Sequence, residues 1–152
     1  MNPKAKASRY SRIYEQVKDL TTPVNNPYSR MATIAAILHH KMGFYFWTGF
    51  YMLDNGDLHV GPYQGPLACL RLRKHTGVCW AALNGGETLI VGNVEEFPGH
   101  IACSSLSKSE IVVPLKQNGH IVGCLDVDSR DFNSFDEVDK EGLEKIVELI
   151  YM

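Results

Sequence analysis

The stretch FYFWTGFYML, residues 44–53, is followed at once by Asp54-Asn55-Gly56-Asp57 and then by a second apolar segment, residues 58–63. Aromatic residues favour strands, and Asn-Gly between two such segments is a strong signal for a tight turn. The two segments are therefore predicted to pair as an antiparallel hairpin.

The rest of the chain adds a second hairpin and several helices. Residues 111–115 and 120–127 flank Gln117-Asn118-Gly119 and predict another tight-turn hairpin. Helical spacing of apolar residues predicts a helix over residues 8–20 and a second one from Asn26-Pro27 to residue 41. Other signals predict strands at 69–72 and 88–91, a short helix at 77–83, a long loop at 92–109, and a last helix from Ser134 with Glu137 in a capping box. Strands joined by tight turns indicate the α+β class, with a mainly antiparallel central sheet flanked by helices.

The composition predicts one compact domain over residues 1–152. The chain is 45% hydrophobic and 21% charged, and a domain of this length needs neither disulfides nor a structural metal for stability. With 15 Lys+Arg against 17 Asp+Glu, it lacks the basic surplus of a nucleic-acid module. Because no apolar stretch is long enough for a membrane helix and no secretory signal begins the chain, we expect a cytoplasmic protein whose thiols stay reduced.

The four cysteines therefore need another explanation than stability. Cys124 lies in an apolar strand and is predicted to be core, whereas Cys69 follows a loop. Cys79 opens the short helix, where the helix dipole is expected to lower the pKa of its thiol. Cys103 lies in the long loop and is the best nucleophile candidate, with an incidental loop thiol as the alternative. The only close pair for a metal is His100 with Cys103, so no metal site is predicted.

Three carboxylates form a second candidate group. Asp126 and Asp128 share one face of their strand, and the hairpin register brings Glu110 to the same end. Crowded carboxylates raise one another's pKa, which suits a general acid or a site for an ammonium group. The alternative is that these aspartates are ordinary turn formers.

Trp47 and Tyr51 form a third candidate group, because they share a face of their strand while Phe50 points away. An aromatic face beside carboxylates suits a small ligand with an apolar end and a cationic end. The alternative is ordinary core packing.

Six short blocks extend from the first strands to the final hairpin: Gly61-Pro62-Tyr63-Gln64-Gly65, Ala68-Cys69, Gly77-Val78-Cys79, Phe97-Pro98-Gly99-His100-Ile101-Ala102-Cys103, Ser109-Glu110-Ile111-Val112-Val113-Pro114 and Leu125-Asp126-Val127-Asp128-Ser129. Together with the cysteine spacing, they resemble the free methionine-(R)-sulfoxide reductases, a family of GAF-domain enzymes. The resemblance implies a GAF-like fold and reduction of free methionine sulfoxide in defence against oxidative stress, with no bound cofactor and no metal.

The resemblance also implies roles for the cysteines. Cys103 matches the catalytic cysteine, which attacks the sulfoxide sulfur, releases methionine and becomes a sulfenic acid. Cys69 matches the resolving cysteine, which condenses with that sulfenic acid to a disulfide. Cys79 matches a third cysteine, an alternative resolving or relay thiol. Thioredoxin or another dithiol would then reduce the disulfide.

The remaining site residues are implied in the same way. Trp47 and Tyr51 match the aromatic residues around the substrate's S-methyl end, and backbone N–H groups of residues 101–103 are candidates for its carboxylate. Glu110, Asp126 and Asp128 match the pocket carboxylates that deliver a proton or bind the substrate ammonium. The long loop, closed over a free amino acid, would leave no room for a polypeptide.

Two function hypotheses follow, an enzyme and a non-catalytic GAF sensor of small molecules or redox state. Sensor GAF domains are usually attached to output modules, for which 152 residues leave no room, so we expect the enzyme. A homodimer through the terminal helices is expected as well.

Overall fold

An antiparallel six-stranded sheet with the strand order β3-β2-β1-β6-β5-β4 forms the centre of the molecule. The structure is a computed structural model and describes residues 1–100 and 103–152. Its strands are β1 (Trp47–Asp54), β2 (Asp57–Gln64), β3 (Arg71–Leu72), β4 (Leu89–Val91), β5 (Ser109–Gln117) and β6 (His120–Ser129). Both predicted hairpins are confirmed, since β1 pairs with β2 and β5 pairs with β6. Their Asn-Gly turns have positive φ at both residues, as a tight hairpin of this kind requires.

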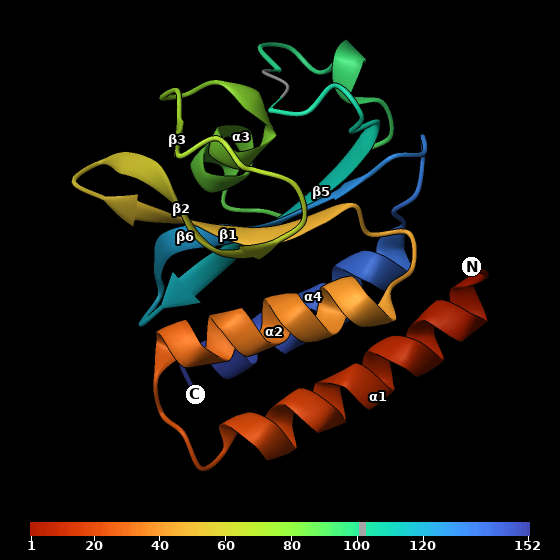
Figure 1. The fold of residues 1–152 in the computed structure, drawn as a ribbon. Helices are drawn as coiled ribbons and strands as arrows, with labels where there is room; N and C mark the ends of the chain where they lie inside the picture. Colours follow the sequence, from red (N-terminus) through yellow and green to blue (C-terminus); the bar gives the residue numbers. More distant parts are fainter. Residues whose placement is uncertain (101–102) are drawn as a thin grey trace.

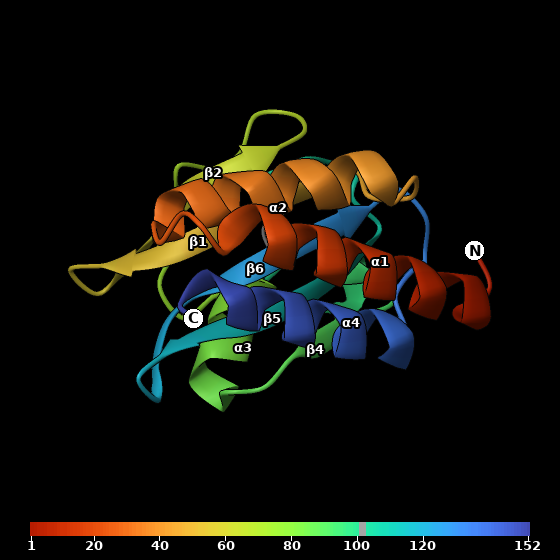
Figure 2. The same cartoon turned by 90° about the horizontal axis from the view of Figure 1, so that it is seen from below.

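Helices cover the two faces of the sheet unequally. The helices α1 (Pro3–Thr21), α2 (Pro27–Lys41) and α4 (Glu137–Val147) lie on one face, and α3 (Gly77–Gly85) lies on the other (Figure 1). Seen from below, α1, α2 and α4 run side by side under the strands (Figure 2). Two 3₁₀ turns complete the fold, η1 (Val94–Glu96) and η2 (Glu148–Ile150). The α+β class with a mainly antiparallel sheet is thus confirmed.

Strand alternation in β1 divides the core into two clusters. Phe50 is fully buried in the larger cluster, between the sheet and the layer of α1, α2 and α4. Trp47 and Tyr51 point to the opposite face and pack in a smaller cluster beneath α3. The opposite orientations predicted for these aromatic residues are confirmed. The smaller cluster carries the candidate site.

Among the described residues, no helix combines the length and hydropathy needed to cross a bilayer.

The first residues of two helices differ from those predicted from the sequence. The first helix begins at Pro3 rather than residue 8, because Asn2 caps it and the buried Lys6 ammonium lies 2.6 Å from the Asp139 carboxylate of α4. The last helix begins at Glu137 with Asp136 as its N-cap, not at Ser134. The Ser134 hydroxyl instead lies 2.6 Å from the Ser129 hydroxyl, so it is not available as a cap.

Asp136→Ala is expected to lower the free energy of unfolding by about 1 kcal/mol, a typical loss for an N-cap. The physical reason is that the Asp136 carboxylate accepts hydrogen bonds from the backbone N–H groups of Val138 and Asp139. Urea denaturation of the full chain measures the change. Glu137→Ala is the matched control, because this exposed side chain is the predicted capping-box residue and makes no capping bond. Equal losses in both variants would contradict the assignment.

Candidate active site

A cavity of about 190 Å³ lies on the α3 side of the sheet. Strands β1, β5 and β6 form its floor, and the loops before β3 and before β5, with the start of α3, form its walls. All the site residues predicted from the sequence line this one cavity: Trp47, Tyr51, Cys69, Cys79, Cys103, Glu110, Asp126 and Asp128. The structure thus brings the three candidate groups together, while their chemical roles stay predictions.

A disulfide joins Cys69 to Cys103 at the wall of this cavity. The two residues are 34 positions apart in sequence, and their Cα atoms are 5.6 Å apart. Cys69 belongs to the loop before β3, not to the predicted strand 69–72, of which only Arg71 and Leu72 pair. The disulfide has the pairing that the resemblance implies. The loop before β3 and the loop before β5 are therefore linked by a bond between two candidate catalytic thiols.

The aromatic residues of β1 hold the loop that carries Cys69. The Trp47 indole N–H donates to the Pro66 carbonyl at 3.1 Å, and the Tyr51 hydroxyl donates to the Cys69 carbonyl at 3.0 Å. Burial, and next the charge of Asp126, raises the pKa of Tyr51, so its hydroxyl stays a donor. These rings are stacked with their centroids 5.7 Å apart. The aromatic face therefore positions a cysteine as well as lining the cavity, a role that strand alternation alone does not reveal.

The carboxylates of β5 and β6 lie together on the cavity floor. Glu110 pairs with Asp128 in the strand register, and Asp126 comes one step further along the same face. The exposed fractions of Glu110 and Asp126 are both 6%. Burial, and next the charge of Asp126, raises the pKa of both Glu110 and Asp128 well above the usual range, and burial raises the pKa of Asp126. Carboxyl groups crowded and buried in this way hold their protons more tightly than exposed ones.

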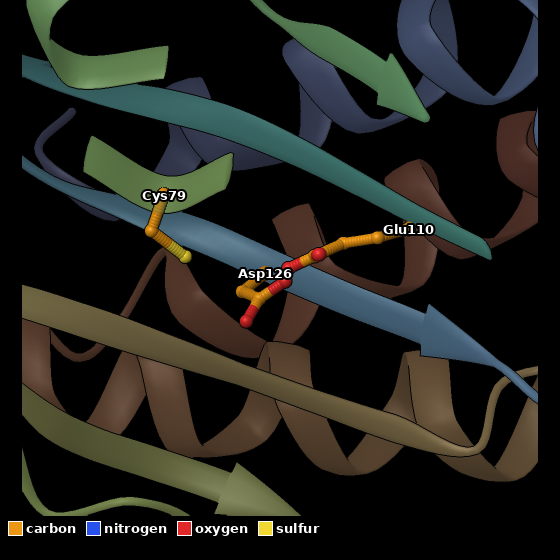
Figure 3. Close-up of side chains that lie close together, drawn as sticks. All are labelled: Cys79, Glu110 and Asp126. Atoms are coloured by element: carbon orange, nitrogen blue, oxygen red, sulfur yellow. The ribbon is translucent and has the colours of Figure 1, made fainter. Parts of the chain in front are cut away.

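Cys79 differs from its sequence-based prediction. Its side chain points from α3 toward Asp126, with the carboxyl group of Glu110 beyond it (Figure 3). The prediction of a lowered pKa is wrong, because a hydrogen bond with Cys124 and then burial raise the pKa of Cys79. The hydrogen bond with Cys124 and burial together outweigh the dipole of so short a helix. Cys124 is fully buried, as predicted, but it lies in the cluster beneath α3.

Several other lining residues were missed by the sequence analysis. Phe46 and Thr76 lack a local signal, because only the fold brings their loops to the cavity. His100 had one signal, its spacing from Cys103, and it also lines the cavity. Burial lowers the pKa of His100, which keeps its ring neutral near pH 7. Of the backbone N–H groups predicted to hold a carboxylate, those of residues 101 and 102 lie outside the described residues.

Comparisons with known proteins agree with this geometry. The family described as "GAF domain" matches residues 31–151. The free methionine-R-sulfoxide reductase of Escherichia coli is 39% identical over 117 residues, which cover 77% of this chain and 71% of that protein. The chain belongs to the free methionine-R-sulfoxide reductase family of GAF domains.

Two further relatives extend the match along the chain. The crystal structure of free methionine-R-sulfoxide reductase from Neisseria meningitidis in complex with its substrate has a TM-score of 0.91 and 40% identity, covering 96% of this chain and 88% of that one. The GAF domain-containing protein A of Dictyostelium discoideum is 49% identical over 147 residues, which cover 96% of this chain and 92% of that protein. The GAF-like fold expected from the sequence is therefore confirmed.

Proposed function

We propose that this chain is an oxidoreductase that converts free L-methionine (R)-S-oxide to methionine. The observation that carries the proposal is the Cys69–Cys103 disulfide, which borders a small cavity with a carboxylate floor. Relatives named for that activity support it: the Escherichia coli protein is 39% identical in sequence, and the Neisseria meningitidis structure matches the fold with a TM-score of 0.91. A disulfide of this kind is the product expected after one turnover.

The cavity accommodates the two ends of the substrate separately. The apolar faces of Trp47 and Tyr51 suit the S-methyl group, and the floor of Glu110, Asp126 and Asp128 suits the ammonium group. A volume of about 190 Å³ is smaller than the ~300–1,000 Å³ typical of pockets for drug-sized ligands. This size favours a free amino acid over a methionine within a polypeptide.

The chemistry begins with both Cys69 and Cys103 reduced. The Cys103 thiolate attacks the sulfoxide sulfur while a protonated carboxyl group of the floor donates a proton to the sulfoxide oxygen. The oxygen is transferred to Cys103, methionine leaves, and a sulfenic acid remains. The Cys69 thiol then attacks that sulfenic acid, forming the disulfide and releasing water. The sulfoxide is thereby reduced by two electrons, and the two thiols are oxidised by two.

Return to the starting state needs an external dithiol. We propose thioredoxin, whose thiolate attacks the disulfide and whose second thiol releases the reduced protein. This cycle needs a reducing compartment, in agreement with a cytoplasmic location. No bound cofactor takes part in these steps.

The proposal includes a homodimer formed through the terminal helices, which light scattering on the full chain would test.

Separated diastereomers of free methionine sulfoxide test the activity directly. We expect methionine release from the (R)-S-oxide with dithiothreitol or thioredoxin as reductant, and none above background from the (S)-S-oxide. Amino-acid analysis of the product measures both. A protein that binds the (R)-S-oxide without releasing methionine would instead be a sensor of the GAF type.

Cys69→Ser is expected to separate the first turnover from the cycle. Without reductant, this variant should still release one methionine per chain, because Cys103 and the carboxyl groups remain. Turnover with thioredoxin should fall by about 10-fold or more, since the sulfenic acid no longer has its resolving thiol. Cys124→Ser serves as the control, because Cys124 is a buried thiol outside the disulfide. Unchanged cycling of Cys69→Ser would assign the resolving role to Cys79.

A further inference from the structure

Three potential metal ligands meet in the cavity although they are distant in sequence. The Cys79 sulfur and one carboxylate oxygen from each of Glu110 and Asp126 all lie within 4.8 Å of one another. Figure 3 shows Asp126 between the other two side chains, which come from α3 and β5. Thiolate sulfur and carboxylate oxygen are common ligands of Zn²⁺. Spacing along the chain does not reveal this group, because its members are 31 and 16 positions apart, from 79 to 110 to 126.

An independent observation marks the same place as a cation site. Oδ1 of Asp126 is buried and has no hydrogen-bond partner among the described residues. A buried carboxylate oxygen without a partner is costly, and binding a cation would remove that cost. Asp126 as a residue is only 6% exposed, so bulk water offers this oxygen little compensation.

The distances fit a zinc ion after small side-chain movements. Zinc bonds of about 2.3 Å to sulfur and about 2.0–2.2 Å to oxygen place neighbouring tetrahedral ligands roughly 3.5 Å apart. The largest separation in this group is at most 4.8 Å, so the carboxylates need to move by about 1 Å. Three protein ligands leave a fourth position open toward the cavity, where water can bind.

The oxidised state leaves this group available. Cys69 and Cys103 are joined to each other, whereas Cys79 is a free thiol. We propose that Cys79, Glu110 and Asp126 bind a thiophilic divalent cation of the Zn²⁺ type, which occupies the cavity in place of the amino acid. The claim that the cation keeps the amino acid out of the cavity rests on the proposed function. The claim that the cation binds does not. Zinc would thus fill the substrate site of the oxidised enzyme between turnovers.

Calorimetric titration of the oxidised full chain with Zn²⁺ tests the site. We expect one zinc ion per chain, with affinity lowered about 10-fold or more in both Cys79→Ser and Glu110→Gln, because each loses a direct ligand. Co²⁺ as a second probe should give a thiolate-to-cobalt charge-transfer band that is absent in Cys79→Ser. Mg²⁺ should not bind, because it avoids thiolate and keeps its water ligands.

Two control variants separate this site from other sources of binding. His120→Gln removes an exposed imidazole at the start of β6 and should leave the zinc affinity unchanged, because His120 is not a member of the group. The double variant His39→Gln/His40→Gln removes two adjacent imidazoles of α2 and should also have no effect. Unchanged zinc affinity in Cys79→Ser and Glu110→Gln, or a cobalt complex without the thiolate band, would overturn the proposal.

Competition distinguishes failure of this proposal from failure of the proposed function. Added methionine (R)-S-oxide should raise the apparent Kd for zinc. Methionine release by a chain that does not bind zinc would overturn the metal site alone. A third outcome is a chain without reductase activity whose zinc binding depends on Cys79 and is unaffected by the amino acid. That result would support the metal site. It would overturn both the exclusion of the amino acid by zinc and the proposed function.

Discussion

Cys103→Ser is expected to reduce methionine release from free methionine (R)-S-oxide by at least about 1,000-fold, since loss of a covalent nucleophile removes the reaction path itself. A serine hydroxyl is a far weaker nucleophile at neutral pH and has no accessible equivalent of the sulfenic acid. The first turnover should disappear as well as the cycle, in contrast to Cys69→Ser. Amino-acid analysis after a single turnover without reductant separates these outcomes.

Binding should survive the same substitution. The aromatic residues Trp47 and Tyr51 and the carboxylate floor are unchanged in Cys103→Ser, so calorimetry should detect the substrate with an affinity similar to that of the reduced wild-type chain. Cys124→Ser should retain normal turnover and shows that loss of a thiol is not itself damaging. A burst of one methionine per chain from Cys103→Ser would refute its role as nucleophile.

The fold follows from the sequence where local chemistry decides it. The Asn-Gly turns after Asp54 and Gln117 determine the two hairpins, and strand alternation then assigns Phe50 and Trp47 to opposite faces. Helix ends are predicted less well because distant contacts compete with local signals. Lys6 extends α1 toward Asp139, and Ser129 engages the hydroxyl of Ser134 that would otherwise be a cap.

The candidate site is likewise predictable where local sequence decides the structure and not where the tertiary fold does. Hairpin register predicts that Glu110, Asp126 and Asp128 meet, because pairing across a tight turn is determined locally. The pKa of Cys79 is predicted in the wrong direction, since burial against Cys124 is a property of the tertiary fold. The loop contacts of Trp47 and Tyr51 are likewise invisible in the sequence. They join segments 19 and 18 residues apart that share no periodic pattern.

Glu110→Gln is expected to lower kcat/KM for the sulfoxide by about 100-fold, the lower end of the effect of losing a general acid. An amide can donate a hydrogen bond but cannot transfer a proton at neutral pH, so proton delivery to the leaving oxygen falls to the other two carboxyl groups. Substrate binding should weaken less than the chemical step. Steady-state kinetics with thioredoxin gives kcat and KM separately.

The same variant should be more stable than the wild type, increasingly so as the pH rises. Burial raises the pKa of Glu110 in the folded chain, so above about pH 4.3, the usual glutamate pKa, the unfolded carboxyl group ionises while the folded one keeps its proton. This difference lowers the free energy of unfolding progressively until the folded pKa is passed, and glutamine removes it. Urea denaturation at about pH 4.5 and about pH 8 should therefore show a small gap between variant and wild type at the lower pH and a larger gap at the higher pH. Glu137→Gln, on the exposed side of α4, should show no such trend. A gap that stays constant or closes with rising pH would mean that Glu110 is ionised in the folded protein, and the assignment of a protonated carboxyl group at this position would be lost.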